Sequence, residues 1–316
     1  MNYILNLTNP EKGEINYESF KFPDGQQSIK ITDDKIKGND VTIISRLNSF
    51  LDLEMIVCAN QALKNLESGA IDLYIPYFLG GRSDRKFFEG GVNYLSQVIS
   101  PLINSQGFNK VFTMDPHSDV LEACINNFRK IDNSSVVRFA IDSMGVDLNN
   151  IVLVSPDGGA LKKIYDIAKK FGINKVINAT KHRDIESGQI LKTEIPDNPY
   201  TEGHTFLIVD DICDGGRTFT ELAQVLRNEI SNESSIYLVV SHGIFSKGFE
   251  ELAKNIDGIF TSNSVDDIIM KDKLRGLYEY KNSKSESLVY KSDYVKQMNV
   301  LKSSSIYYTF KLEKEY

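Results

Sequence analysis

Short apolar runs alternate with longer amphipathic stretches along most of the chain. We predict strands at 3–7, 41–47, 71–77 and 110–115 in the first half, and at 151–156, 175–180, 205–211, 236–242 and 258–264 in the second. Most of these runs are continuous rather than alternating in polarity. Continuous runs are typical of strands that are covered on both faces of a sheet.

The stretches between the runs have the spacing of amphipathic helices. We predict helices at 51–67, 92–105, 159–171 and 217–230, the third followed by Gly172. Strands that alternate with helices indicate βαβ units and parallel sheets. The sequence therefore predicts an α/β fold.

The two halves of the chain have a similar build, and 316 residues are enough for two domains. "VFTMDPHSD" and "IVLVSPDGG" each lead from a strand through a proline into a polar turn. The pattern breaks near 132–148, so we assign residues 1–134 to an N-terminal domain and 135–299 to a C-terminal domain. The tail 300–316, strand-like near 304–311, either packs on the N-terminal domain or is a loose end.

Composition excludes several classes of protein. The net charge of -7 gives no basic field for nucleic acid, and no apolar run approaches the roughly 20 residues that span a bilayer. The cysteines Cys58, Cys124 and Cys213 form no CxxC pair, which argues against a disulfide framework or a zinc site. The first residues do not have the pattern of a signal peptide. We expect a cytoplasmic protein with no nucleic-acid or membrane partner.

The stretch "VDDICDGGRT" (209–218) carries the clearest chemistry. Ligands of parallel α/β sheets bind beyond the carboxyl ends of strands. Adjacent carboxylates there can accept hydrogen bonds from ribose hydroxyls, directly or through a metal. Glycines that open into a helix let backbone N–H groups close on a phosphate. A tight turn with solvated acids is the alternative, but the combination favours a sugar phosphate.

This stretch resembles the phosphoribosyl-diphosphate-binding motif of type I phosphoribosyltransferases and of ribose-phosphate pyrophosphokinases. Further segments resemble the second family, in its order and with near-family spacing: "FPDGQ" (22–26), "PYFLGGRSDRK" (76–86), "MDPHS" (114–118), "SPDGG" (155–159) and "KHR" (181–183). The resemblance implies two phosphoribosyltransferase-like domains, each a mostly parallel sheet flanked by helices. It also implies transfer of a diphosphate from ATP to the C1 hydroxyl of ribose 5-phosphate, with Mg²⁺ as cofactor and AMP as the second product.

The resemblance assigns the ATP site to residues of three segments, and it assigns two residues as magnesium ligands. The adenine pocket, which the family takes from a neighbouring subunit, would consist of Phe22, Asp24 and Gln26. Arg82 would cover the base or reach phosphate, with Ser83, Asp84 and Lys86 nearby. His117 and Asp157 would ligate Mg²⁺, with His117 also in the ATP site. Out of this context, His117 would be structural and "RSDRK" a surface charge run.

The resemblance assigns the acceptor site and the catalytic groups to the second half. Asp210, Asp211 and Asp214 would hold the ribose hydroxyls, and the 5-phosphate loop would consist of Gly215, Gly216, Arg217 and Thr218. Lys181 and Arg183 match the catalytic basic pair, although "KHR" alone would be a solvated cluster. We take His242 as structural. A homo-oligomer, a dimer or a hexamer, is implied.

The 5-phosphate loop departs from the family's usual Asp-Thr-x-Gly-Thr. Here Gly215 removes a hydroxyl and Arg217 adds a planar cation suited to phosphate oxygens. The departure leaves two acceptors open: ribose 5-phosphate, or a 5′-substituted ribose such as ADP-ribose in nicotinamide nucleotide salvage. Gln26, Ser83 and "FFEGGVNY" (87–94) also depart from the family, which puts its regulation in doubt. A non-catalytic regulatory homologue and a phosphoribosyltransferase are less favoured.

Overall fold

The computed structural model describes residues 1–183, 190–196, 198–268, 295–298 and 300–301. These residues divide into two compact units. Unit 1 comprises Met1–Asp132 and the described residues of Asn299–Tyr316, and unit 2 comprises Asn133–Met298. The tail at 304–311, predicted to be strand-like, lies outside the described residues.

Unit 1 contains a five-stranded sheet in the order β1-β4-β5-β6-β7, with all neighbours parallel. Its strands are β1 (Asn2–Asn6), β4 (Asp40–Ile44), β5 (Ile71–Tyr74), β6 (Lys110–Met114) and β7 (Phe128–Ile131). The helices are α1 (Phe50–Asn65), α2 (Ser100–Asn104) and α3 (Val120–Cys124), with a π-helical stretch (Leu95–Ile99) before α2 and 3-10 turns at Pro10–Lys12 and Asp34–Ile36. The four strands predicted for this half are confirmed, although β4 and β5 end earlier.

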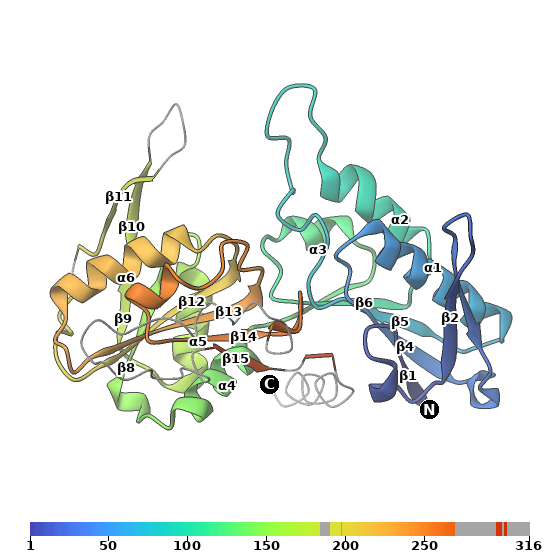
Figure 1. The fold of residues 1–316 in the computed structure, drawn as a ribbon, viewed down its shortest axis with the longest axis horizontal. Coiled ribbons are helices and arrows are strands. Elements are labelled where there is room, and N and C mark those ends of the chain that lie inside the picture. The colour runs from blue at the N-terminus through green and yellow to red at the C-terminus, as the bar shows by residue number, and fades with distance from the viewer. Residues whose placement is uncertain (184–189, 197, 269–294, 299, 302–316) are drawn as a thin grey trace. The chain divides into compact units, whose positions relative to one another are not determined.

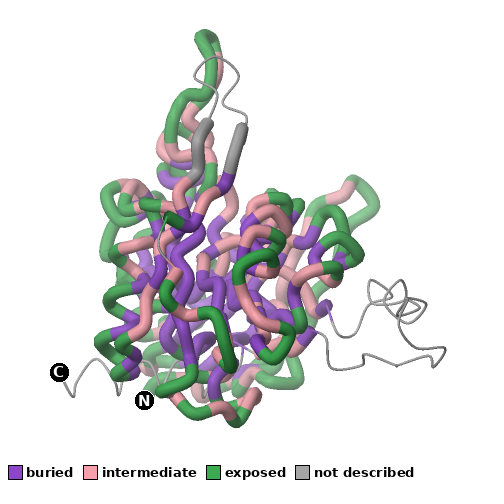
Figure 2. Tube along the Cα trace, turned by 90° about the vertical axis from the view of Figure 1, so that its left-hand side faces the viewer, coloured by how far each residue is buried: buried purple, intermediate pink, exposed green. Residues whose placement is uncertain are grey.

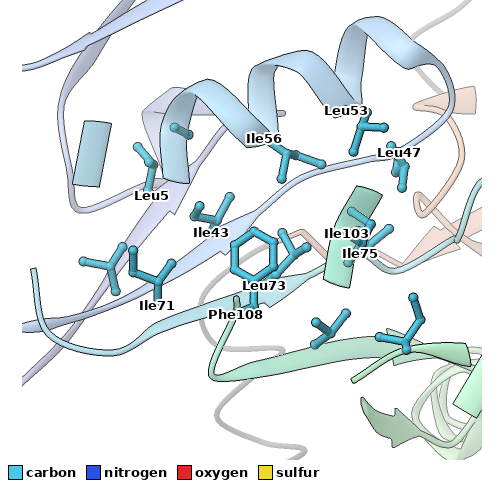
Figure 3. Packing of buried hydrophobic residues seen from close by; sticks show 14 of the residues in the cluster. Leu5, Ile43, Leu47, Leu53, Ile56, Ile71, Leu73, Ile75, Ile103 and Phe108 are labelled. Atoms are coloured by element: carbon cyan, nitrogen blue, oxygen red, sulfur yellow. The ribbon is translucent and has the colours of Figure 1, made fainter. Parts of the chain in front are cut away.

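Helix α1 covers one face of this sheet. It begins at a capping box, in which Ser49 Oγ accepts from the Asp52 N–H at 3.3 Å and Asp52 Oδ2 accepts from the Ser49 N–H at 2.9 Å. Such a box satisfies donors that the first turn leaves free. Figure 3 shows Leu53 and Ile56 of α1 packed among Leu5, Ile43 and Leu73 of the strands. The apolar core of unit 1 therefore lies between α1 and the sheet.

An antiparallel hairpin of β2 (Tyr17–Lys21) and β3 (Gln27–Ile31) also belongs to unit 1. Its turn closes with a hydrogen bond of 2.8 Å from the Phe22 N–H to the Gln26 carbonyl, and Gly25 has φ +101°. The sequence pattern did not predict these strands, because β2 is mostly exposed and offers no apolar run.

Unit 2 contains a six-stranded sheet in the order β15-β14-β13-β12-β8-β9, again with all neighbours parallel. Its strands are β8 (Ile151–Ser155), β9 (Val176–Asn178), β12 (Thr205–Cys213), β13 (Ser235–Gly243), β14 (Gly258–Ser262) and β15 (Val295–Met298). The helices are α4 (Ser134–Met144), α5 (Leu161–Phe171) and α6 (Arg217–Glu229), with 3-10 turns at Leu148–Asn150 and Leu252–Lys254. An antiparallel hairpin, β10 (Thr180–Arg183) and β11 (Ile190–Glu194), completes the unit.

Two features of unit 2 differ from the prediction. Residues 134–144, where the sequence pattern breaks, form α4, whose Val136, Val137, Ala140 and Ile141 are buried. Strand β12 continues to Cys213, so the paired acids lie within the strand rather than at its end. Most residues of β8, β12, β13 and β14 are buried, and Figure 2 shows the buried stretches of the chain in purple.

The α/β prediction with two mostly parallel sheets flanked by helices is confirmed (Figure 1). No helix among the described residues is long and apolar enough to cross a bilayer.

Candidate functional site

The strand order of unit 2 reverses beside β8. From β8 the chain proceeds to β9 on one side, and then returns to β12 on the other, with β13, β14 and β15 further along. In parallel sheets a crevice forms at such a reversal, outside the carboxyl ends of the two strands, and ligands bind there. The residues that follow β8 and those that end β12 are therefore the candidate site.

Three carboxylates gather at this reversal. Asp211 is buried at 6% exposure, and its N–H donates to Asp210 Oδ1 at 2.9 Å. Burial raises the pKa of Asp210 well above its ordinary value, and the charges of Asp211 and Asp157 raise it further. Carboxylates that repel one another in a partly dry place are suited to a cation or to hydroxyl donors.

Asp157 is fixed in position by its own turn. Its Oδ1 accepts from the N–H groups of Gly159 and Ala160 at 3.1 and 3.2 Å, and Ser155 Oγ donates to its carbonyl at 2.7 Å. This turn leads from β8 into α5. The structure thus brings Asp157, a predicted magnesium ligand, to the edge where Asp210 and Asp211 lie.

The loop Asp214–Gly216 leads from β12 into α6. Gly216 has φ +79°, and a Cβ there would lie 3.1 Å from Leu252 Cδ2, so the turn requires glycine. Among the hydrogen bonds of the described residues, none uses the N–H groups of Gly215, Gly216, Arg217 or Thr218. Free N–H groups at a helix start, together with the helix dipole, favour an anion such as phosphate.

Residues 244–246, which the sequence analysis did not assign to the site, hold this loop through hydrogen bonds. The Ile244 and Phe245 N–H groups donate to the Cys213 carbonyl at 2.9 and 3.1 Å, and the Ser246 N–H donates to the Asp214 carbonyl at 3.1 Å. Ser246 Oγ also donates to Asp214 Oδ1 at 2.6 Å. The segment follows β13, the neighbour of β12, so the same strand-end rule could have found it.

Arg217, at the first position of α6, forms an ion pair on the helix surface. Its Nε lies 2.6 Å from Glu221 Oε1, and its side chain is 70% exposed. A phosphate contact by Arg217 would replace Glu221 as its partner.

The predicted catalytic pair, Lys181 and Arg183, belongs to β10. The hairpin begins two residues after the carboxyl end of β9, at the edge that also carries Asp157, and Figure 1 shows it projecting from the sheet. Lys181 pairs with Thr193 and Arg183 with Ile190, with a register shift between His182 and Arg183.

The predicted ATP residues all belong to unit 1. Arg82, Ser83, Asp84 and Lys86 belong to the segment that follows β5, and His117 belongs to the segment that follows β6, the parallel neighbour of β5. Phe22, Asp24 and Gln26 lie in the exposed hairpin turn. Asp115, just before His117, is buried with φ +42°, a costly backbone conformation of a kind that clusters at functional sites.

The described residues include no group of three or more His, Cys, Asp or Glu side chains that could hold a metal alone. Mg²⁺ does not need such a group, because it usually binds one or two carboxylates together with substrate phosphates and water. Asp157 and Asp210, whose charges repel each other, are a donor set that fits this ion. His117 lies in the other unit, and its nitrogen is the less typical donor for Mg²⁺.

Known proteins are similar to this chain in both sequence and fold. A model of the phosphoribosyl transferase domain matches residues 130–267. The chain is 27% identical to the ribose-phosphate pyrophosphokinase of Thermoplasma volcanium over 253 residues, 78% of this chain and 82% of that protein. It is 29% identical to that of Shewanella oneidensis over 258 residues, 80% of this chain and 76% of the relative.

The fold is similar to the crystal structure of phosphoribosylpyrophosphate synthetase from Mycobacterium smegmatis, with a TM-score of 0.75, 16% identity and 99% coverage of each chain. The fold and the strand-end site thus define a protein with a phosphoribosyltransferase-type domain. The chain is similar in sequence to ribose-phosphate pyrophosphokinases, which are transferases, and residues 130–267 match the phosphoribosyl transferase domain.

Proposed function

We propose that this protein transfers the β,γ-diphosphate of ATP to the C1 hydroxyl of ribose 5-phosphate, giving phosphoribosyl diphosphate and AMP. One observation carries the proposal: the carboxylates Asp210, Asp211 and Asp157 gather at the strand-order reversal beside a loop with free backbone N–H groups. The carboxylates would hold ribose hydroxyls, and the loop of Gly215, Gly216, Arg217 and Thr218 would hold the 5-phosphate.

The proposed residues act by positioning and by charge. Asp210, Asp211 and Asp214 would orient the ribose so that its C1 oxygen attacks the β-phosphorus in line. Asp157, with Asp210 beside it, would hold Mg²⁺, which when bound neutralises charge on the phosphates of ATP. His117 is the second magnesium ligand that the family resemblance implies. Lys181 and Arg183 would stabilise the charge that develops on the transferred diphosphate.

The ATP side of the reaction would use the unit 1 residues. The exposed ring of Phe22 would stack on adenine, with Asp24 and Gln26 at its polar edge. Arg82 would reach the base or a phosphate, near Ser83, Asp84 and Lys86.

A second acceptor is a 5′-substituted ribose such as ADP-ribose, which would feed nicotinamide nucleotide salvage. The favouring observation is the missing side chain at Gly215, where an added Cβ would make ordinary van der Waals contacts with Lys247 Cγ at 3.4 Å and Ser246 Oγ at 3.9 Å. A loop without a side chain there has room for a larger group on the 5′ oxygen.

The test is release of AMP from ATP and Mg²⁺ with either ribose 5-phosphate or ADP-ribose. We expect AMP with ribose 5-phosphate, or with ADP-ribose alone if the second acceptor is correct. No AMP with either would reject the proposed function. Arg217→Gly should shift the preference towards ribose 5-phosphate, because it removes a cation from the loop.

We also propose that the protein is a cytoplasmic homo-oligomer, a dimer or a hexamer. The rings of Phe20 and Phe22 lie 5.2 Å apart and remain 45% and 44% exposed at the hairpin. A neighbouring copy, whose adenine pocket Phe22 would complete, would cover the rest of this apolar surface. The free thiols of Cys58, Cys124 and Cys213 suit a reducing compartment.

A further inference from the structure

Lys247 lies beside the loop that leads from β12 into α6. The chain reaches it from β13 through Ser246, whose N–H and Oγ both donate to Asp214, at 3.1 and 2.6 Å. Phe245 has φ +47° and donates its N–H to the Cys213 carbonyl. These bonds fix the backbone before Lys247 against the start of the loop, at Cys213 and Asp214. Lys247 therefore starts from a defined position rather than from a free surface segment.

The stem of Lys247 lies against the place where a side chain at position 215 would begin. A Cβ on Gly215 would be 3.4 Å from Lys247 Cγ, an ordinary van der Waals contact. A lysine can lay its methylene stem along such a surface while its ammonium stays in water. Because Gly215 has no side chain, the stem of Lys247 lies directly beside the backbone of the loop.

The two cations beside the loop differ in their partners. Arg217 is paired with Glu221 at 2.6 Å, whereas among the ion pairs of the described residues none includes Lys247. Lys247 is exposed. An ammonium without a carboxylate partner can bind a ligand anion without first giving up an ion pair.

We infer that Lys247 determines specificity for the group on the 5′ oxygen of the ribose, by binding the second phosphate of a 5′-diphosphate ester. This inference rests on the proposed function. The free N–H groups of Gly215–Thr218 supply donors for one phosphate. A second phosphate joined to the first would lie beyond these groups. The Lys247 ammonium, a compact point charge on a flexible stem that lies beside Gly215, can reach it there.

The experiment compares two acceptors, ADP-ribose and ribose 5-phosphate, in the full chain with ATP and Mg²⁺. Lys247→Ala should lower kcat/KM for ADP-ribose about tenfold, the loss of about one charge-assisted hydrogen bond, mainly through a higher KM. The value for ribose 5-phosphate should stay within about twofold. If the protein does not turn over one of the two acceptors, the inhibition constant of that acceptor is measured in the reaction with the other acceptor. This constant then replaces its kcat/KM in the comparison.

Three further variants separate specificity from structure. Lys247→Arg keeps a cation and should retain most of the preference. Gly215→Thr places side-chain atoms against the lysine stem and should reduce the ADP-ribose value as Lys247→Ala does. Lys254→Ala, the matched control, removes a lysine that pairs with Glu251 at 2.6 Å nearby, and should change neither acceptor.

An unchanged ratio between the two acceptors in Lys247→Ala overturns the inference while the proposed function stands. An equal loss for both acceptors also overturns it, because Lys247 would then serve the loop or the first phosphate. If the unaltered protein releases no AMP with either acceptor, the proposed function fails. In that case calorimetry decides the inference. The Kd for ADP-ribose divided by the Kd for ribose 5-phosphate is compared between the unaltered protein and Lys247→Ala.

Discussion

At the scale of single residues, the charge of Asp210 has an unfavourable environment in the free protein. Burial is the main cause of its raised pKa, and the nearby carboxylates of Asp211 and Asp157 add to it. Removing a carboxylate from water and placing it beside like charges both disfavour ionisation. A site with this property is expected where a ligand supplies the missing hydroxyl donors or cation.

Asp210→Asn should therefore stabilise the free protein at neutral and alkaline pH. Because the folded-state pKa is raised, the stability contribution of Asp210 is fully present below the ordinary pKa of about 4 and is lost as the pH rises through the folded pKa. The amide of the variant does not ionise and has no such loss. The melting temperature, measured without Mg²⁺ or nucleotide, should rise by about 2–4 °C for each kcal/mol regained at pH 8, and the gain should vanish near pH 4.

The control for this prediction is Asp166→Asn, which neutralises an exposed carboxylate on α5 and should leave the pH profile unchanged. A gain in Asp210→Asn that is the same at pH 4 and pH 8 would contradict the prediction, because its cause would then not be ionisation.

The residue types at the strand ends were predictable, and their partners were not. An apolar run that closes on Asp210 and Asp211 and leads through Asp214, Gly215 and Gly216 into a helix indicates a ligand site. The ion pair of Arg217 with Glu221 and the contact of Lys247 with Gly215 depend on side-chain conformations and on a loop from another strand. No periodicity in the sequence encodes these contacts.

At the scale of elements, buried strands and long helices followed the sequence pattern, and small exposed elements did not. Continuous apolar runs predicted β8, β12, β13 and β14 because both faces of these strands are covered. The hairpin of β2 and β3 has no such run. Helix α4 begins with two serines followed by the β-branched Val136 and Val137, residues with a low helix propensity, so the helix signal in the sequence is weak there.

The turn from β12 into α6 gives a prediction at this scale. Gly216→Ala should cost about 1–2 kcal/mol, because φ +79° disfavours an L side chain and the new Cβ would lie 3.1 Å from Leu252 Cδ2. The melting temperature should fall by about 2–4 °C per kcal/mol, and acceptor affinity should fall with it as the N–H groups move. Thermal unfolding and the KM for the acceptor measure the two effects.

Gly215→Ala is the matched control for stability. Its φ lies outside the left-handed region, and its Cβ would make only ordinary van der Waals contacts, with Lys247 Cγ at 3.4 Å and Ser246 Oγ at 3.9 Å, so the melting temperature should not change. Equal destabilisation by the two substitutions would show that the conformation of Gly216 is not what the turn requires.

At the scale of the whole molecule, the proposed residues divide between two units. The ATP segments at 22–26, 82–86 and 117 belong to unit 1, whereas the carboxylates, the 5-phosphate loop and the basic pair belong to unit 2. The repeated strand–proline–turn pattern predicted two α/β domains, because each half of the chain contains enough strands for a sheet of its own. The strand order, and with it the reversal beside β8, could not be predicted, because pairing depends on contacts distant in sequence.

This division makes the role of Lys181 testable apart from ATP binding. Lys181 belongs to β10 of unit 2, so Lys181→Ala leaves every proposed ATP residue of unit 1 in place. If it stabilises only the charge that develops during transfer, kcat and kcat/KM should fall together, by about 10²–10³, while the Kd for ATP stays within about twofold. Lys192→Ala removes a cation from β11 of the same hairpin, opposite His182, and should retain most turnover. Unchanged turnover in Lys181→Ala would remove the catalytic assignment, and an equal loss in both variants would indicate that the hairpin needs its net charge rather than this lysine.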